Sequence, residues 1–392
     1  MGTTSLDRRR FLQMGTLGMG VGLARPTLTL GRTVAPAGRA ANTGRVRLVG
    51  DGLGLTTAES ADLWTELADS GSIERDAYSI GGTVAELEAH FAAVLGKERA
   101  VFMPTGTLAN HLAVRALAGG TGRAIVQAES HLFNDSGDCV QTLSGITLMP
   151  LAPGRATFTV DDARNVIGRT IGGRVARPVS VISLETPVRR RFGETFDEAE
   201  MDRVTTFARR EGIRLHLDGA RIFLQSAYTG RPVADYARPF DTVYVSLYKY
   251  FNAASGAILA GPRALLDDLF HTRRMFGAGL PGAWPFASIA RHFAPAFIDR
   301  FRQAVAVSEA WIEQVARHDA FTIERIPAGT NIFRLRVSHP DPAGVRARLA
   351  SRGVDLGAPR PDGAGFLLTV NETWNRTTPD ALADAFVAAL RA

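Results

Sequence analysis

The stretch Ile213-Arg214-Leu215-His216-Leu217-Asp218-Gly219-Ala220-Arg221 decides the fold class. Apolar and polar residues alternate in it up to Asp218, which is the pattern of a β-strand that ends at an acidic residue. In open α/β sheets, ligands bind beyond the carboxyl ends of the strands. Asp218 therefore stands where a ligand is expected, although an Asp that only caps the next turn is the alternative.

A second alternating stretch, with apolar Val243, Val245 and Leu247, ends at Lys249, which lies 31 residues after Asp218. Strand patterns and helical patterns alternate through this part of the chain, which predicts an α/β domain with a largely parallel sheet. The helical patterns cover 83–95, 107–117 and 198–210, and further strand patterns cover 100–103 and 179–184.

The pattern changes after about residue 290. A long helix-like stretch at 291–318 is followed by a strand pattern at 331–337, a helix at 341–352, a strand at 366–370 and a helix at 379–391. This order predicts a smaller C-terminal α+β domain. We expect a large domain at 48–290 and a small domain at 291–392.

Residues 1–47 have the character of an export leader followed by a linker. Asp7-Arg8-Arg9-Arg10-Phe11-Leu12 resembles the twin-arginine signal, with Arg8 and Arg9 as the pair, and an apolar, Gly-rich stretch at 14–24 follows. That stretch is too short to span a membrane, which takes about 20 residues. We expect export by the twin-arginine translocase to the periplasm or the exterior, with cleavage after Ala24 or Ala37; a disordered basic tail is the alternative.

The positive charge of the chain is concentrated in this leader. The whole chain carries +6, while residues 1–47 hold eight Arg and one Asp, so the remainder is close to neutral. No basic stripe with interleaved aromatic residues is present, and we expect no nucleic-acid partner. The single Cys139 excludes an intrachain disulfide; we expect it to be a small buried apolar residue and assign it no role.

Lysine is rare in this chain: there are 43 Arg but only Lys97 and Lys249. Lys can form a Schiff base and Arg cannot, so a retained Lys suggests use of its amine. Lys97 lies in a turn between Gly96 and Glu98, where a solvated surface charge is expected. Lys249 follows an apolar strand, and Phe251 close behind it argues against full exposure.

A third segment, Pro104-Thr105-Gly106-Thr107, lies between a strand and a helix. The free N–H groups of a helix N-terminus can bind a phosphate, Gly106 allows close approach, and Thr107 can cap the helix. An ordinary capped turn would have the same pattern.

Together these segments resemble the threonine aldolase and β-eliminating lyase family of fold-type I pyridoxal-phosphate enzymes, from about Gly50 to the C-terminus. The family's His-x-Asp-Gly-Ala-Arg signature stands at 216–221, its phosphate segment is similar to 104–110, and its lysine segment is similar to 249–261. Weaker similarities are at Asp76, Tyr78, Thr83-Val84 and Thr330-Asn331.

The resemblance implies pyridoxal 5'-phosphate as cofactor, an amino acid as substrate, a homodimer or homotetramer, and no metal site. It also implies residue roles. Lys249 carries the cofactor as a Schiff base, Asp218 holds the pyridine nitrogen, and His131 stacks on the ring and helps to move a proton from the substrate's β-hydroxyl. Arg221 lies near the cofactor and the substrate carboxylate, and Gly106 and Thr107 bind the phosphate.

The chain departs from the family pattern at three places. Tyr248 replaces a Ser or Thr before the lysine, although its phenol could still reach the phosphate, and Pro281 replaces an arginine directed at the partner subunit's phosphate. Phe366 replaces an arginine that clamps the substrate carboxylate, with Arg360 nearby in sequence. We expect either an apolar wall at Phe366 and a preference for a bulky substrate of the phenylserine type over threonine, or a clamp restored by Arg360.

The favoured function is Cα–Cβ cleavage of a β-hydroxy-α-amino acid to glycine and an aldehyde. The alternatives are β-elimination by the same site, and an exported protein that binds the cofactor without catalysis. A nucleotide-binding Rossmann protein is disfavoured, because no Gly-x-Gly-x-x-Gly follows a strand with an acidic residue about 20 positions later.

Overall fold

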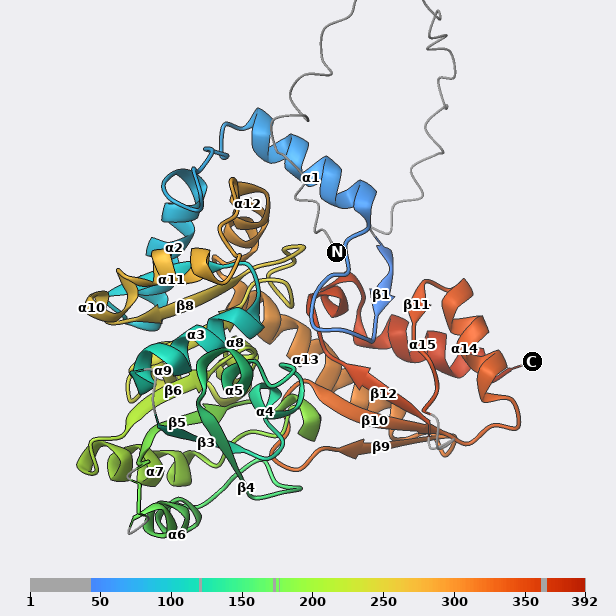
Figure 1. Ribbon diagram of the computed structural model, residues 1–392. Helices are drawn as coiled ribbons and strands as arrows, with labels where there is room; N and C mark the ends of the chain where they lie inside the picture. Colours follow the sequence, from blue (N-terminus) through green and yellow to red (C-terminus); the bar gives the residue numbers. More distant parts are fainter. Residues whose placement is uncertain (1–43, 120–121, 172–173, 176, 361–364, 392) are drawn as a thin grey trace, which may run out of the picture. The chain divides into compact units, whose positions relative to one another are not determined.

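A seven-stranded sheet lies at the centre of the large domain in the computed structural model, which describes residues 44–119, 122–171, 174–175, 177–360 and 365–391 (Figure 1). The strand order in the described chain is β2-β8-β7-β6-β5-β3-β4. Strands β4, β3, β5, β6 and β7 are parallel, while β8 runs antiparallel to both of its neighbours. The strands are β2 Arg99–Met103, β3 Arg123–Gln127, β4 Thr147–Leu151, β5 Val179–Glu185, β6 Arg214–Asp218, β7 Thr242–Ser246 and β8 Ala257–Gly261. The predicted mostly parallel α/β fold is confirmed.

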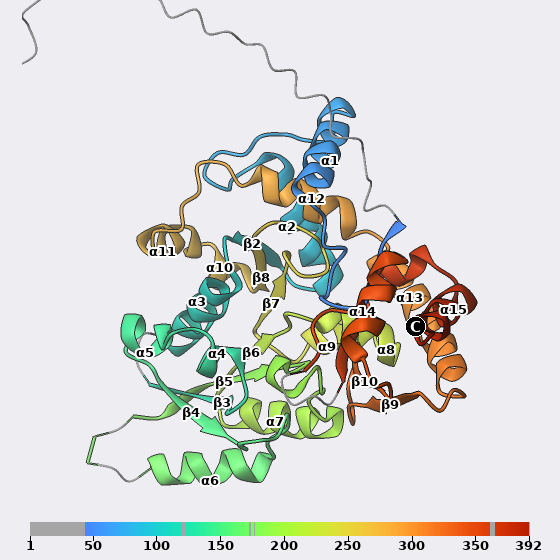
Figure 2. The same ribbon diagram turned by 90° about the vertical axis from the view of Figure 1, so that its right-hand side faces the viewer.

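Helices cover both faces of this sheet, which is why its central strands are apolar on both sides. Helix α3 packs against β5, β6, β7 and β8, and Figure 2 shows α3, α4 and α5 on one side of the sheet with α8 and α9 on the other. The helices of this part are α1 Thr57–Asp69, α2 Gly82–Leu95, α3 Gly106–Ala118, α4 His131–Asn134, α5 Cys139–Ser144, α6 Val160–Thr170, α7 Glu198–Arg210, α8 Ile222–Thr229, α9 Val233–Ala237, α10 Arg263–Leu266, α11 Leu269–Met275 and α12 Trp284–Phe293.

As far as the structure describes it, the C-terminal part contains a small antiparallel sheet, three α-helices and the 3₁₀ helix η3 Glu372–Arg376. In the described residues its strand order is β12-β10-β9. Its core is aromatic: Trp311 packs edge to face on Trp374 and Phe386, with ring centroids 5.5 and 4.9 Å apart. The elements are α13 Phe297–Val315, β9 Phe321–Arg325, β10 Ile332–Val337, α14 Pro342–Ser351, β12 Phe366–Thr369 and α15 Pro379–Ala389.

The N-terminal strand β1 (Val46–Arg47) pairs in parallel with β11 (Val354–Asp355), so the first described residues lie against the C-terminal part. The long helix expected at 291–318 is two helices, since Pro295 and Ala296, which has a φ of 52°, separate α12 from α13. Pro disfavours helical geometry in the residue before it and cannot donate a backbone hydrogen bond.

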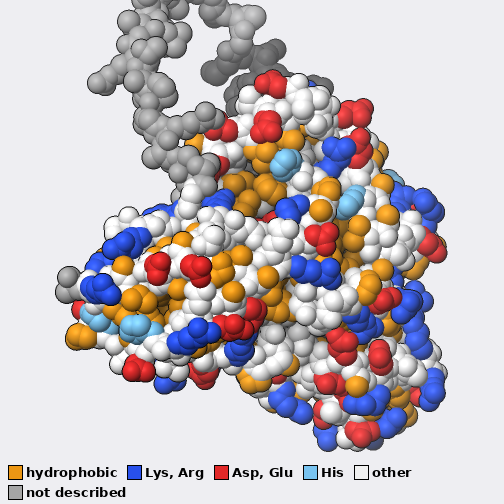
Figure 3. Space-filling model, turned by 180° about the vertical axis from the view of Figure 1, so that it is seen from behind, with side chains coloured by type: hydrophobic (Ala, Val, Ile, Leu, Met, Phe, Trp, Pro, Cys, Tyr) orange, Lys and Arg blue, Asp and Glu red, His pale blue; other side chains and the backbone are white. Residues whose placement is uncertain are grey.

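The three-part division at 1–47, 48–290 and 291–392 stays a prediction. Residues 1–43 lie outside the described chain, and the two later parts belong to one compact unit, Asn42–Ala392. Within the described residues, no helix is both long enough and apolar enough to cross a bilayer. Figure 3 shows acidic and basic side chains interspersed over one face of the molecule.

Candidate functional site

The carboxyl ends of four parallel strands meet at one edge of the sheet and supply the site. His131 comes shortly after β3, Glu185 and Asp218 are the last residues of β5 and β6, and Lys249 comes three residues after β7. In the strand register Glu185 lies opposite Asp218, and Asp218 lies opposite Tyr244. The topology therefore brings together residues that are far apart in sequence, at the edge where such sheets bind ligands.

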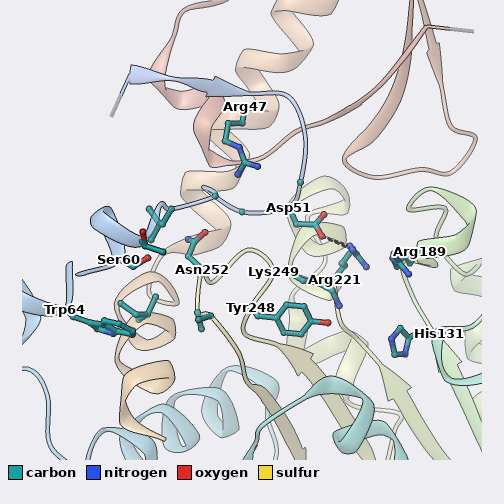
Figure 4. A pocket seen from close by; sticks show the side chains of 18 of the residues that line it. Arg47, Asp51, Ser60, Trp64, His131, Arg189, Arg221, Tyr248, Lys249 and Asn252 are labelled. Carbon is teal, nitrogen blue, oxygen red and sulfur yellow. Dashed lines mark hydrogen bonds and ion pairs between the residues drawn. The ribbon is translucent and has the colours of Figure 1, made fainter. Parts of the chain in front are cut away.

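A cavity of about 900 Å³ opens at this edge (Figure 4). A small inner recess continues it toward the strand ends, where Asp218, Glu185 and Tyr244 line the wall. His131, Arg189, Arg221 and Lys249 line both spaces. Other residues that line the cavity are Arg47, Asp51, Leu55, Ser60, Trp64, Asp135, Tyr248, Asn252 and Ile289.

Lys249 has the properties of a nucleophilic amine. Burial, together with the positive charge of Arg221, lowers the pKa of Lys249 to about 8, although Asp218 acts in the opposite direction. Its ammonium lies 5.2 Å from the ring centroid of Tyr248 and 5.9 Å from that of Tyr244. A lowered pKa increases the fraction of neutral amine at pH 7, which is the reactive form.

Lys97 differs from the expected solvated surface charge. It is half-buried, and its Nζ donates to the carbonyl of Phe240 at 2.6 Å. Burial lowers the pKa of Lys97 to about 8 as well. Lys97 therefore anchors a turn. Lys249 differs from Lys97 because it lines the cavity. Cys139 is half-buried rather than fully buried.

Asp218 is held by a chain of buried side chains. Its Oδ2 accepts a bond of 2.6 Å from Asn110 Nδ2, and its Oδ1 accepts one of 3.1 Å from the backbone N–H of Ala220. Asn110 Oδ1 in turn lies 2.9 Å from Nε2 of His216, whose Nδ1 lies 2.8 Å from Thr242 Oγ1. All of these side chains are buried.

The direction of this chain follows from its donors. Asn110 uses its N–H on Asp218, so its oxygen must accept from His216 Nε2–H, and Nδ1 of His216 must accept from the Thr242 hydroxyl. Burial lowers the pKa of His216 to about 4, which keeps the ring neutral in this tautomer. The Asp218 carboxylate is thereby fixed in orientation beside Lys249 and His131 in the recess.

His131 begins α4 and is half-buried at the cavity wall. Its backbone N–H donates to Glu185 Oε2 at 2.6 Å, while its Nδ1 is buried and has no hydrogen-bond partner among the described residues. Burial lowers the pKa of His131, against the opposing effect of Asp218. The ring is therefore neutral near pH 7 and can accept a proton.

Glu185 is a fully enclosed carboxyl group that joins two loops. Its Oε2 accepts from His131 and its Oε1 accepts the backbone N–H of Arg189 at 2.9 Å. Gln127 holds the main chain of Glu185 by bonds of 2.8 and 2.7 Å. Burial, reinforced by the negative charge of Asp218, raises the pKa of Glu185 to about 7.

Arg221 is paired with an acidic residue that the motif did not indicate. Its Nε and Nη2 lie 2.9 and 2.8 Å from Asp51 Oδ2, and Asn331 Nδ2 lies 3.4 Å from Asp51 Oδ1. Although burial favours the neutral acid, Arg221 holds the pKa of Asp51 below its ordinary value. Arg221 lies in the cavity, and its contact with a substrate carboxylate stays a prediction.

The expected phosphate segment lies at the start of α3. Thr105, not Thr107, caps this helix, since Thr105 Oγ1 accepts from the backbone N–H of Leu108 at 3.2 Å. Gly106 is buried where a Cβ would come 2.0 Å from the Tyr244 hydroxyl, so only glycine fits there. Gly106 and Thr107 do not line the two spaces described above. Their phosphate role, and that of the 43% exposed Tyr248, stay predictions.

Phe366 does not form a wall of the cavity, contrary to expectation. It is fully buried on β12, where it lies opposite Leu335 in the register and belongs to the hydrophobic core. Arg360 also does not line the cavity. Its guanidinium lies 6.0 Å from the ring centroid of Phe192.

Two residues outside the cavity anchor the region after α11. The Asp76 carboxylate accepts the backbone N–H groups of Ala283 and Trp284, and the carbonyl of Pro281 accepts the backbone N–H of Tyr78.

Sequence reasoning missed Asp51, Asn110, Glu185 and Arg189. Asn110 and His216 stood inside the quoted motifs without a role. Glu185 ends an apolar strand, the same signal that marked Asp218, so it could have been found. Asp51 lies in an irregular segment and Arg189 in a short 3₁₀ turn, and their place in the site depends on tertiary structure.

The fold and these strand-end residues define the class of protein: a fold-type I α/β protein of the pyridoxal-phosphate enzyme type. The chain belongs to the beta-eliminating lyase family, whose model matches residues 61–338. The predicted family is confirmed. That family depends on pyridoxal phosphate.

Curated relatives in this family have different reactions. The chain is 30% identical to a low-specificity L-threonine aldolase of Candida albicans over 218 residues, which are 55% of this chain and 58% of that protein. It is also 30% identical to the alanine racemase TOXG of Cochliobolus carbonum over 234 residues, 59% of this chain and 58% of that protein. The chain thus matches little more than half of the length of these relatives.

A solved structure from Exiguobacterium sp. 255-15, a candidate aromatic amino acid beta-eliminating lyase/threonine aldolase, has a TM-score of 0.73 at 25% identity. The alignment covers 89% of this chain and 97% of that one.

The residues present fit pyridoxal phosphate on chemical grounds. An amine, a carboxylate fixed in orientation and an imidazole with an unpartnered buried nitrogen line one recess. Among the residues that the structure describes, no group of three or more His, Cys, Asp or Glu could hold a metal ion.

Proposed function

We propose that this protein is a pyridoxal-phosphate-dependent lyase that cleaves the Cα–Cβ bond of a β-hydroxy-α-amino acid, giving glycine and an aldehyde. One observation carries the proposal: the Lys249 amine, the oriented Asp218 carboxylate and the neutral His131 ring line a single recess at the strand ends. Bound there, pyridoxal phosphate supplies an electron sink for the negative charge that develops at Cα.

The side chains have separate tasks in this proposal. Lys249 holds the cofactor through its amine, and Asp218 keeps the pyridine nitrogen protonated. His131 takes the proton of the β-hydroxyl, since burial keeps its ring neutral. The β-carbon leaves as the aldehyde, a proton adds to Cα, and the reaction balances without a further reactant.

The cavity supports a bulky substrate, although not through Phe366. Its outer part is bounded by Leu55, Trp64 and Ile289. The Trp64 indole N–H donates to the carbonyl of Pro285 at 3.0 Å, which ties α1 to α12. In Figure 4 Trp64 lies on the opposite side of the cavity from His131 and Arg189. We therefore keep the expectation that a phenylserine-type substrate is cleaved better than threonine.

The family name favours β-elimination as a second candidate, since the same amine, carboxylate and base would serve it. The products separate the two reactions. Cα–Cβ cleavage releases glycine and an aldehyde, whereas β-elimination of a leaving group releases ammonia and a keto acid. A protein that binds the cofactor without catalysis is the third possibility, and no product from any amino acid would favour it.

The test is a panel of β-hydroxy-α-amino acids, including threonine and phenylserine, incubated with the cofactor-loaded protein. We expect glycine and aldehyde in equal amounts, with a higher kcat/KM for phenylserine than for threonine. Ammonia and keto acid without glycine would favour β-elimination. Equal or better cleavage of threonine would contradict the expected substrate preference while preserving the reaction.

Export and assembly are part of the proposal. Residues 1–47, with Arg8 and Arg9, would direct the folded protein to the twin-arginine translocase, and the mature protein would act in the periplasm or outside the cell. We also propose a homodimer or homotetramer. Exposed Tyr78, Ile80 and Met275 support it, because large apolar side chains at a surface favour an interface.

A further inference from the structure

Four cations line the cavity, which are Arg47, Arg189, Arg221 and Lys249. Two of them have a task or a close partner, and a third lies away from His131. Lys249 is the cofactor amine of the proposed function. The Asp51 carboxylate pairs with the Nε and one Nη of Arg221, so much of the positive charge of Arg221 is balanced inside the protein. Arg47 lies 3.9 Å from Asp355, and Figure 4 shows it above Asp51, away from His131. Arg189 is the remaining cation among these lining residues.

Arg189 is only loosely paired. Its Nη1 lies 3.3 Å from Asp135 Oδ2, and its side chain is 56% exposed. Arg190 makes the closer contact with the same carboxylate, with Nη2 2.8 Å from Oδ1 and Nε 3.3 Å from Oδ2. The hydrogen bond from Arg190 is the main cause that lowers the pKa of Asp135. Arg189 can therefore leave Asp135 while Arg190 still pairs with it.

The backbone of Arg189 is nevertheless fixed in the site. The buried Glu185 carboxylate accepts the N–H of Arg189 with one oxygen and the N–H of His131 with the other. One rigid group at the end of β5 thus sets the positions of both residues. In Figure 4 the Arg189 and His131 side chains lie on the same side of the cavity, next to Arg221.

Phe366 stands where the resemblance placed a carboxylate-binding arginine and is buried on β12, so that position supplies no guanidinium. We propose that Arg189 binds the carboxylate of the amino-acid substrate. A planar guanidinium binds a carboxylate through two parallel hydrogen bonds. Arg189 supplies such a group from a backbone that Glu185 holds, on a largely exposed side chain. The inference rests on the proposed function, because it concerns the substrate of the same site.

The experiment uses the cofactor-loaded protein with glycine and glycinamide as probes, followed by the change in visible absorbance. Glycinamide lacks the carboxylate charge. We expect Arg189→Ala to weaken glycine binding about ten- to a hundredfold, the effect of losing a charge-assisted bond, and to leave glycinamide binding nearly unchanged. Arg189→Lys should recover part of the loss, since it keeps the charge without the planar fork.

Arg191→Ala is the matched control, because Arg191 belongs to the same 3₁₀ turn, Arg189–Arg191, but pairs with Glu194 and does not line the cavity. We expect glycine affinity within about twofold of the wild type in this variant. Covalent attachment of the cofactor to Lys249 should be unchanged in both variants, which shows that neither disturbs the fold.

The outcomes distinguish this inference from the proposed function. Glycine affinity that is unaffected by Arg189→Ala, or reduced equally by Arg191→Ala, would overturn the inference alone. Arg189-dependent glycine binding without cleavage of any β-hydroxy amino acid would support it and refute the proposed reaction. A wild-type protein that loads cofactor but does not bind glycine would overturn both.

Discussion

Asp218 is the residue whose surroundings are most completely determined. The chain Thr242–His216–Asn110–Asp218 lies inside the sheet and between the sheet and α3, so each member has little freedom to reorient. Charge-assisted bonds of this kind fix an acceptor's direction as well as its charge. We attribute to Asn110 the task of aiming Asp218 at the position of the pyridine nitrogen.

Asn110→Ala should therefore impair the same step as Asp218→Asn. Each single variant should still attach the cofactor at Lys249, and each should have a lower kcat, because the ring nitrogen is protonated less effectively. The double variant should be no slower than Asp218→Asn alone, since the two residues act as one unit. Losses in kcat that multiply in the double variant would contradict this assignment.

His216 makes the stability of the protein depend on pH. Its folded pKa of about 4 lies below the ordinary value of 6.5, so between these values the unfolded chain binds more protons. This contribution to stability is complete above pH 6.5 and is lost as the pH falls toward 4. His216→Gln should flatten the decline of the unfolding free energy between pH 6.5 and 4 by up to about 1.4 kcal/mol per pH unit. Identical slopes in urea titrations of both proteins would show that His216 charges freely.

The elements were predictable where a periodic pattern coincides with burial. Helix α7 covers the expected 198–210, and β6 ends at Asp218 as expected. Strand β7 ends at Ser246, so Lys249 lies in the following turn. Local signals could not reveal pairing between distant segments, which is why the contacts from Asp51 to Arg221 and from Glu185 to His131 were missed. Phe366 shows a different limit. The resemblance to the family indicated its position in the sequence, but only the packing of the fold shows that its side chain points into the core.

Phe366→Ala should reduce stability rather than change substrate binding. Phe366 is fully buried, and truncating a core Phe typically costs about 3–5 kcal/mol. Denaturant unfolding of the loaded protein measures this loss, and glycine affinity should be unchanged where the variant is folded. Phe366→Arg should be still less stable, because the core offers no partner for a charge. A stable Phe366→Arg variant with tighter glycine binding would show instead that this strand faces the substrate.

At the scale of the whole molecule, charge is divided unevenly between residues 1–47 and the rest of the chain. The excess of positive charge lies in residues 1–47, and the remainder is close to neutral. A protein of this family that acts outside the cytoplasm would have to receive its cofactor before export. The twin-arginine pathway, which carries folded proteins, suits that order of events.

Export is tested with Arg8→Lys and Arg9→Lys together. The total charge is kept, but the paired arginines are lost, so we expect the folded, cofactor-loaded protein to accumulate in the cytoplasm. Cell fractionation measures this, with Arg10→Lys as the control, because Arg10 lies outside the pair and before both expected cleavage sites. Unchanged export of the double variant would mean that residues 1–47 do not act as a twin-arginine signal.

The central claim is that Lys249 holds pyridoxal phosphate, and borohydride reduction of the loaded protein followed by peptide mapping tests it most directly. Lys97 is the internal control, since burial lowers the pKa of both amines to about 8 and only Lys249 lines the cavity. We expect a visible absorption band, label on Lys249 alone, and loading that becomes faster as the pH rises toward about 8, because the neutral amine reacts. Label on Lys97, or no band after incubation with pyridoxal phosphate, would contradict the account.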